Sequence, residues 1–201
     1  MEQTFIEKYL EGVSKIAGQL DREQINLLVT LLVKTRDEHG RLFILGVGGG
    51  AGNASHAVCD VRKITAIETY APTDNISELT ARTNDEGWEN VFEGWLKGSR
   101  LSKKDMLLVF SVGGGDAEKN ISANLVKALK LGKSVGCKIG GVVGPRGGYT
   151  AAVADACVKV PEVDKDLNTP YAESFQVVVW HLLVSEPRLR INQTKWESIL
   201  E

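Results

Sequence analysis

The chain has no long apolar run and no excess of charge of one sign. Its most apolar stretch, residues 175–184, contains Gln176 and His181 and has about half the length that a membrane-spanning helix needs. Lys and Arg number 24 against 26 Asp and Glu, a formal charge of −2, which argues against a surface for nucleic acid or anionic membranes. The first twenty residues are charged throughout and lack a signal-peptide pattern. We therefore expect a cytoplasmic protein with no membrane or nucleic-acid partner.

Cysteine is also scarce, and its placement excludes two kinds of site. Cys59, Cys137 and Cys157 are an odd number of thiols without C-x-x-C spacing. Such thiols fit a reducing compartment better than a disulfide framework or a zinc knuckle. A bound metal would therefore need histidines and carboxylates as its ligands.

The length and apolar content predict one domain. Apolar residues make up 43% of the 201 residues, which is enough to fill a single core. We divide the chain into N-terminal helices (1–40), an α/β core (41–186) and a C-terminal tail (187–201), to which the sequence assigns no role.

Hydrophobic periodicity predicts two helices before any strand, and then strands that alternate with helices. Apolar residues recur at helical spacing over 5–17 and 25–35, and His39-Gly40 ends the second helix. Strands are expected at 41–47, 64–70, 105–112, 138–143 and 156–160, and further helices at 54–63, 122–131 and 171–184. This alternation predicts a five-stranded parallel sheet between two helical layers, an αβα sandwich.

Two glycine-rich turns follow strands, at 46–52 and 113–115. Backbone N–H groups and a helix N-terminus can approach an anion at such turns. The first turn also fits the G-x-G-x-x-A dinucleotide pattern, with Glu68 as the acid that would bind a ribose. A nicotinamide oxidoreductase is therefore an alternative, although two helices precede the motif and the following helix carries His56 and Asp60.

Two pairs of chemically active side chains share helix faces. His56 and Asp60 lie four residues apart. Glu173 and His181 lie eight apart, about 12 Å along the axis and about 80° around it. Such pairs can bind a divalent metal or combine an acid with a base. The alternative is that His181 is a hydrogen-bonded core histidine and Glu173 a first-turn acid favoured by the helix dipole.

The order of these and other motifs resembles the sugar isomerase (SIS) family of phosphosugar-binding domains, and within it the phosphoheptose isomerase family. The resemblance spans nearly residues 1–186. In the last helix Glu173, Gln176 and His181 stand where the family has Gln, His and His. The remaining matching features are the two first helices, Gly46–Gly50, His56-x-x-x-Asp60, Asn84-Asp85, a strand ending at Ser111, Ser122–Ala128 and Gly144–Gly148.

The resemblance implies a flavodoxin-like SIS fold and the interconversion of a ketose phosphate and an aldose phosphate through an enediol. The expected reaction is sedoheptulose 7-phosphate to glycero-manno-heptose 7-phosphate, with Asp60 as base and His181 as acid. It also implies a homotetramer with active sites at its interfaces. The implied zinc ligands are His56, Asp60, Glu173 and His181. The implied substrate-binding residues are Gly48, Gly49, Gly50, Asn84, Asp85, Ser111, Gly113, Ser122 and Glu173.

Three departures from the family pattern bear on this expectation. Asp60 is one methylene shorter than the family's Glu, and about 1 Å of misplacement can cost a hundredfold in rate. Glu173 replaces a neutral amide with an anion, which favours a divalent metal. The loop over 111–122 is longer than the family's, so Ser111, Ser122, glycine N–H groups and Lys119 are the candidate phosphate donors.

Two further alternatives remain open. Proteins with SIS domains also serve as non-catalytic, regulatory binders of sugar phosphates, and the retained His56 and His181 argue against this. An isomerase of another sugar phosphate is the second, since the longer 113–120 segment would suit a change of substrate.

Overall fold

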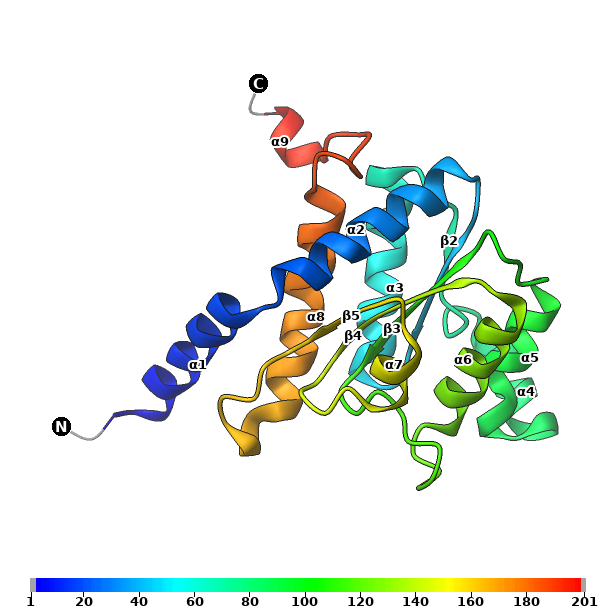
Figure 1. Ribbon diagram of the computed structural model, residues 1–201, viewed down its shortest axis with the longest axis horizontal. Coiled ribbons are helices and arrows are strands. Elements are labelled where there is room, and N and C mark those ends of the chain that lie inside the picture. Colours follow the sequence, from blue (N-terminus) through cyan, green and yellow to red (C-terminus); the bar gives the residue numbers. More distant parts are fainter. Residues whose placement is uncertain (1–2, 200–201) are drawn as a thin grey trace.

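The computed structural model describes residues 3–199, and they form an αβα arrangement around a parallel sheet (Figure 1). The strands are Leu42–Gly46 (β1), Thr69–Tyr70 (β2), Met106–Ser111 (β3), Lys138–Val143 (β4) and Ala156–Lys159 (β5). They lie in the order β2-β1-β3-β4-β5, and each neighbouring pair is parallel. The predicted fold class is confirmed. In sheets of this kind, ligands bind outside the carboxyl ends of the strands where the order reverses, here at β1 and β3.

The helices cover the sheet in two groups (Figure 1). Helices α1, α2, α3 and α8 pack on one face, and α4 to α7 pack on the other. Their bounds are Phe5–Gln19 (α1), Arg22–Asp37 (α2), Gly49–Asp60 (α3), Ile76–Glu86 (α4), Val91–Gly98 (α5), Ala123–Val135 (α6), Gly148–Val153 (α7), Asn168–Ser185 (α8) and Lys195–Ile199 (α9). Short 3-10 turns span Trp88–Asn90 (η2) and Lys165–Leu167 (η3). None of the helices in the described part of the chain is long and apolar enough to cross a bilayer.

Alternation along the strands creates two separate cores. In β1, Leu42 and Ile44 point to the face that α2, α3 and α8 cover, whereas Phe43 and Leu45 point to the face under α5 and α6. All four side chains are fully buried. Each face of the sheet therefore carries its own helical layer, and a residue on α3 and a residue on α4 lie on opposite sides of the sheet.

Local sequence signals set several helix boundaries. Thr4 and Glu7 form a capping box at the start of α1. The Asp21 side chain accepts hydrogen bonds from two backbone N–H groups at the start of α2. Gly136 ends α6 with a left-handed φ of 77°, which glycine adopts without steric cost. Helix α1 thus begins at the predicted residue, whereas α2 begins three residues before the predicted position 25 and α6 ends four residues after the predicted position 131.

The predicted strand at 64–70 is largely wrong. Residues Val61–Thr65 (η1) continue α3 as a π-helical turn, and β2 has only two residues. Tertiary contacts stabilise this turn, because the backbone N–H groups of Ile191 and Asn192 both donate to the Ile64 carbonyl. The Asn192 side chain also donates to the Lys63 carbonyl. The C-terminal tail thus supplies donors that no local pattern reveals.

Helices α4, α5 and α7 were not predicted from the sequence. Helix α4 has no fully buried residue, and α7 is only six residues long. Weakly buried and short helices carry little periodic signal.

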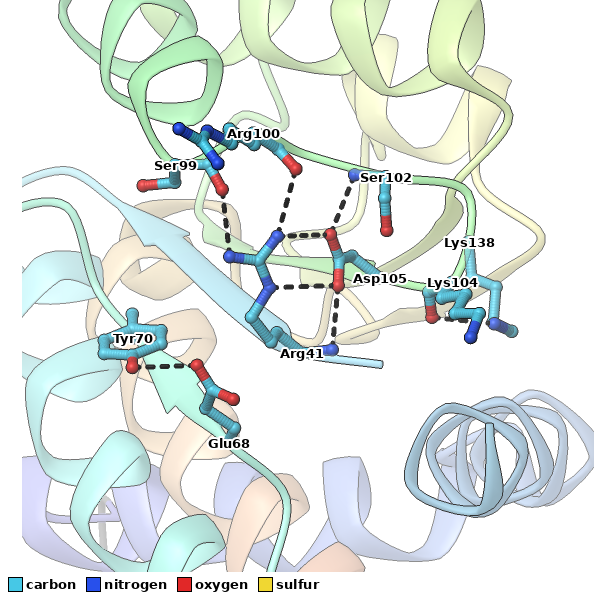
Figure 2. Close-up of polar contacts among 9 residues, drawn as sticks. All are labelled: Arg41, Glu68, Tyr70, Ser99, Arg100, Ser102, Lys104, Asp105 and Lys138. Atoms are coloured by element: carbon cyan, nitrogen blue, oxygen red, sulfur yellow. Dashed lines mark hydrogen bonds and ion pairs between the residues drawn. The ribbon is translucent and has the colours of Figure 1, made fainter. Parts of the chain in front are cut away.

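An ion pair between Arg41 and Asp105 lies at the end of the sheet where β1 and β3 begin (Figure 2). The Arg41 guanidinium donates to both carboxylate oxygens of Asp105, and also to the carbonyls of Ser99 and Arg100. The carboxylate further accepts hydrogen bonds from the N–H groups of Arg41 and Ser102. Burial opposes ionisation of Asp105, but these hydrogen bonds outweigh it, so the pKa of its carboxyl lies below the ordinary value.

Candidate active site

The candidate site lies along the seam between α3 and α8, on one face of the sheet. Gly49, Asn53, His56 and Asp60 recur at spacings of four, three and four residues, which places them on one stripe of α3. The Asn53 side-chain amide donates to the Glu173 carbonyl and to the Gln176 side-chain oxygen of α8, at 3.0 and 2.8 Å. These bonds hold the two helices in register, so that the stripe of α3 faces α8.

Three of the four predicted metal ligands come together at this seam. The Asp60 Oδ2 atom lies 3.9 Å from Nε2 of His56 and 3.9 Å from Nε2 of His181. One ligand atom of each residue lies within 4.8 Å of the other two. The side chains of His56, Asp60 and His181 are 61%, 22% and 47% exposed, so the cluster is open to a ligand from solvent.

A hydrogen bond determines which nitrogen of His181 faces the cluster. Its Nδ1 atom lies 2.9 Å from the Val177 carbonyl oxygen. Because a carbonyl can only accept, Nδ1 carries the proton in this contact. The neutral imidazole therefore presents the lone pair of Nε2 toward Asp60, the arrangement found in metal-bound histidines.

The three residues fit a divalent metal by donor type and by spacing. Imidazole nitrogens and a carboxylate oxygen are ordinary zinc ligands. In a tetrahedral site with bonds of about 2.1 Å the donor atoms are roughly 3.4 Å apart. The Asp60 oxygen lies 3.9 Å from each imidazole nitrogen and all three donor atoms lie within 4.8 Å of one another, so the side chains must move closer together to bind one ion. A fourth position remains for another ligand.

Glu173 lies outside this cluster. A Cβ atom added to Gly49 would be 2.5–2.6 Å from the Glu173 carboxylate oxygens, so this carboxylate packs directly against the glycine. Gly49 begins α3, and the first turn of a helix attracts anions. The protein thus places its own negative charge at the first glycine turn, which makes that turn a poor site for a phosphate group.

The second glycine turn, after β3, is anchored differently. The Ser111 hydroxyl oxygen accepts a hydrogen bond from the Gly114 N–H at 3.0 Å. The carbonyls of Gly114 and Gly115 accept bonds from the first N–H groups of α7, those of Thr150 and Tyr149. Both glycines have positive φ, at 72° and 81°. The turn is therefore held rigidly beside the carboxyl end of β3.

The extra residues in the loop after this turn close on themselves. Asp116 and Ile121 exchange two backbone hydrogen bonds. The Asp116 side chain accepts from the N–H groups of Glu118 and Lys119. Ser122 is the N-cap residue just before α6, has a left-handed φ of 49° and makes no side-chain cap bond. Its hydroxyl is not committed to capping the helix, and strained residues of this kind cluster at functional sites.

Asn84 and Asp85 lie apart from the other predicted site residues. They sit in the last turn of α4, on the opposite side of the sheet from α3 and α8, where the Asn84 amide donates to the Asp85 carboxylate. With Leu79, Thr80 and Trp88, Asn84 lines an open cavity of about 750 Å³. The sheet separates them from His56 and His181 within one chain.

The dinucleotide alternative is wrong in its geometry. Glu68 does not end a strand but precedes β2, and β2 pairs with the beginning of β1, since Leu42 is opposite Thr69. Glu68 accepts a hydrogen bond from the Tyr70 hydroxyl, as Figure 2 shows. Glu68 therefore lies near the beginning of β1, whereas the glycine turn follows the other end of that strand at Gly46. It is away from any nucleotide bound at that turn.

Sequence reasoning missed two residues that shape the seam. Asn53 lies four residues from Gly49 and three from His56, so the helical stripe was visible in the sequence. Trp180 had no comparable signal, because it precedes His181 directly, and neighbours on a helix are about 100° apart. Its contact with the histidines depends on the side-chain conformation.

Proteins of known name resemble this chain over most of its length. No protein-family model matches it. A lincomycin biosynthesis protein of Streptomyces lincolnensis is 31% identical over 188 residues, which are 89% of this chain and 66% of that protein, just under two thirds of its length. A phosphoheptose isomerase of Rhodospirillum rubrum is 30% identical over 149 residues, or 72% of this chain and 73% of the relative.

Solved structures support the same fold. The phosphoheptose isomerase of Neisseria gonorrhoeae superimposes with a TM-score of 0.76, at 22% identity, over 89% of this chain and 92% of that chain. At this identity the likeness concerns the fold alone. Together with the identity and coverage of the Rhodospirillum relative, it shows that the chain belongs to the phosphoheptose isomerase family of SIS-domain proteins.

Proposed function

We propose that the protein is an aldose–ketose isomerase of a sugar phosphate, and that its substrate is sedoheptulose 7-phosphate, converted to glycero-manno-heptose 7-phosphate. The observation that carries this proposal is the convergence of His56, Asp60 and His181 at the seam of α3 and α8. The Rhodospirillum relative, a phosphoheptose isomerase, supports the same reaction.

In this proposal Asp60 takes a proton from the carbon next to the substrate carbonyl. In the metal-free cluster, His181 in its imidazolium form gives the proton on Nε2 to the carbonyl oxygen, which yields an enediol. Asp60 then returns its proton to the neighbouring carbon, and His181, now without a proton on Nε2, takes the proton of the other enediol hydroxyl, which becomes the aldehyde oxygen and completes the isomerisation. Support comes from the 3.9 Å separation of the two groups, which lets both reach adjacent atoms of one sugar. When an ion is bound, Nε2 would ligate it and carry no proton, so the acid role and the ligand role of His181 are alternatives.

We assign the phosphate to the second glycine turn. Ser111, Ser122 and the N–H of Gly113 are the candidate donors, and Lys119 offers a positive charge on the same loop. The Glu173 carboxylate at Gly49 supports this choice, because it disfavours a second anion at the first turn. Gly48, Gly49 and Gly50 would then face the uncharged part of the sugar.

His56, Asp60 and His181 would hold a divalent ion, with zinc as the proposed metal. When bound, such an ion polarises the substrate carbonyl and stabilises negative charge that develops on the sugar oxygens. Glu173 remains a proposed fourth ligand. To serve as one, its side chain must leave Gly49 for the cluster.

A homotetramer with active sites at its interfaces is part of the proposal. Helix α1 reaches out beyond α8 (Figure 1), and Phe5, Ile6 and Leu10 are exposed on it. Asn84 and Asp85 are separated from the cluster by the sheet, so only another copy of the chain would bring them to it as substrate-binding residues. We also infer a reducing, cytoplasmic setting from the three free cysteines.

The test is turnover of sedoheptulose 7-phosphate by the purified protein, followed as aldose formation by NMR, with and without a chelator and added zinc. We expect turnover that the chelator abolishes and zinc restores. Asp60→Asn and His181→Gln should each fold and lose roughly 10²–10⁴ in rate. His39→Gln, at the end of α2 and away from the cluster, serves as the matched control.

Three other outcomes would lead to different conclusions. Normal turnover in Asp60→Asn or His181→Gln would refute the proton-transfer roles. An unchanged metal content in His56→Ala would refute the metal site and leave the acid–base reading. Binding of the sugar phosphate without turnover would favour a non-catalytic regulatory binder or an isomerase of another sugar phosphate.

A further inference from the structure

Trp180 contacts both imidazoles of the cluster. Its ring stacks on that of His181, with centroids 3.5 Å apart and planes at 29°. It also meets the His56 ring edge-on, with centroids 4.8 Å apart and planes at 68°. The indole is only 1% exposed and belongs to the core under α3 and α8. The buried indole of Trp180 thus lies beneath the exposed imidazoles of His56 and His181.

The stacking requires His181 to fold back along its own helix. Adjacent residues of a helix point about 100° apart, so Trp180 and His181 would not ordinarily face each other. The hydrogen bond from His181 Nδ1 to the Val177 carbonyl turns the imidazole back over the indole. Two contacts therefore hold this ring, one at Nδ1 and one across its face.

His56 has less support of its own. Its side chain is 61% exposed, and besides Asp60 and His181 its ring contacts Trp180. An exposed imidazole without such a contact samples several staggered conformations. The indole edge restricts it to the side of α3 that faces His181.

We propose that Trp180 is a positioning residue that holds the imidazoles of His56 and His181 in the geometry needed to bind a divalent cation. This inference rests on the proposed function of the cluster. In this role Trp180 acts through the two histidines that its ring contacts.

A purely structural role for Trp180 makes different predictions. The indole also lines a small apolar cavity with Leu32, Ile44 and Leu183, so its loss would disturb core packing. Its Nε1 atom is buried and has no hydrogen-bond partner among the described residues. Phenylalanine removes this unpaired donor and keeps an aromatic face, so Trp180→Phe separates the stacking contact from the indole N–H.

The first measurement is NMR of the imidazole protons in the metal-free protein. The chain has three histidines, so His39, at the end of α2, is an internal control. Ring currents of the indole should displace the signals of His56 and His181. In Trp180→Leu these two sets of signals should move toward the positions of a free imidazole, while those of His39 stay within experimental error.

The second measurement is Co²⁺ affinity of the parent, Trp180→Phe, Trp180→Leu, and Trp95→Phe, a control tryptophan in the other core. If each imidazole regains about three staggered conformations, affinity should fall by about tenfold in Trp180→Leu. We expect a smaller loss in Trp180→Phe and none in Trp95→Phe. Circular dichroism and thermal unfolding of each variant establish that it is folded.

The outcomes separate this inference from the proposed function. Co²⁺ affinity within twofold of the parent in folded Trp180→Leu, with His56→Ala strongly weakened, would overturn the positioning role and leave the metal site intact. Equal, weak affinity in the parent and His56→Ala would overturn the metal site. If the metal site is overturned, or if Trp180→Leu does not fold, the positioning role is tested by NMR of the parent and Trp180→Phe alone. His181 proton signals at the positions of a free imidazole in both proteins would refute the stacking of the two rings.

Discussion

Replacing Asp105 with Asn should destabilise the protein strongly. The carboxylate is 3% exposed, and each of its oxygens accepts two hydrogen bonds, three of the four from Arg41 (Figure 2). An amide in the same place has one oxygen, so its NH₂ group must face two N–H donors whichever way it is turned. Losing two charge-assisted bonds, each contributing about 1.5–3 kcal/mol, predicts a loss of about 3–6 kcal/mol in the free energy of unfolding.

The assay is urea unfolding of the parent and variants at pH 7 and at fixed protein concentration. Asp155→Asn is the matched control, because that exposed carboxylate accepts a single backbone hydrogen bond, from Ile139, and should lose about 1 kcal/mol or less. A loss below about 1 kcal/mol in Asp105→Asn, or a loss equal to that of the control, would refute the reasoning.

The ion pair between Arg41 and Asp105 also predicts how the free energy of unfolding depends on pH. The pKa of Asp105 is lowered in the folded protein, so its contribution is fully present above the unfolded pKa of about 3.9. It is lost as the pH falls through the lowered folded pKa. The difference in unfolding free energy between the parent and Asp105→Asn should therefore narrow below about pH 4, and a constant difference from pH 7 to pH 3 would contradict the linkage.

Two further predictions concern α3 and the thiols. In Gly49→Ala the new methyl group would collide with the Glu173 carboxylate, so the variant should fold but lose turnover because the Glu173 side chain must move. The control is Gly52→Ala, where an added Cβ has nothing within 4 Å. It should keep parent activity, and its free energy of unfolding should rise by up to about 1 kcal/mol from helix propensity. Equal turnover in both variants would argue against a role for the Glu173 position. Iodoacetamide at pH 8 should modify exposed Cys59 and spare Cys137, because burial raises the pKa of that thiol to about 12. Mass spectrometry of the peptides identifies the modified thiols, and modification of Cys137 before Cys59 would contradict this prediction.

Much of the candidate site was predictable because its signals are local. His56 and Asp60 lie one helical turn apart, and any helix over these residues brings them to one face. The glycine turns at the ends of apolar strands likewise indicate where β1 and β3 open to a ligand. The alternation of strands and helices predicted the parallel sheet, because each period reports which faces of an element are buried.

Contacts between distant segments were decided only by the tertiary structure. The sequence alone determined that His181 and Glu173 share a helix face, but packing of α8 on α3 brought His181 to Asp60 and left Glu173 against Gly49. Asn84 lies on the face of the sheet opposite α3 and α8, and the side-chain conformation of Trp180 places its ring beneath the histidines. Such contacts depend on register and rotamer across elements far apart in the chain, whereas periodicity and caps reflect interactions within a single helix or strand.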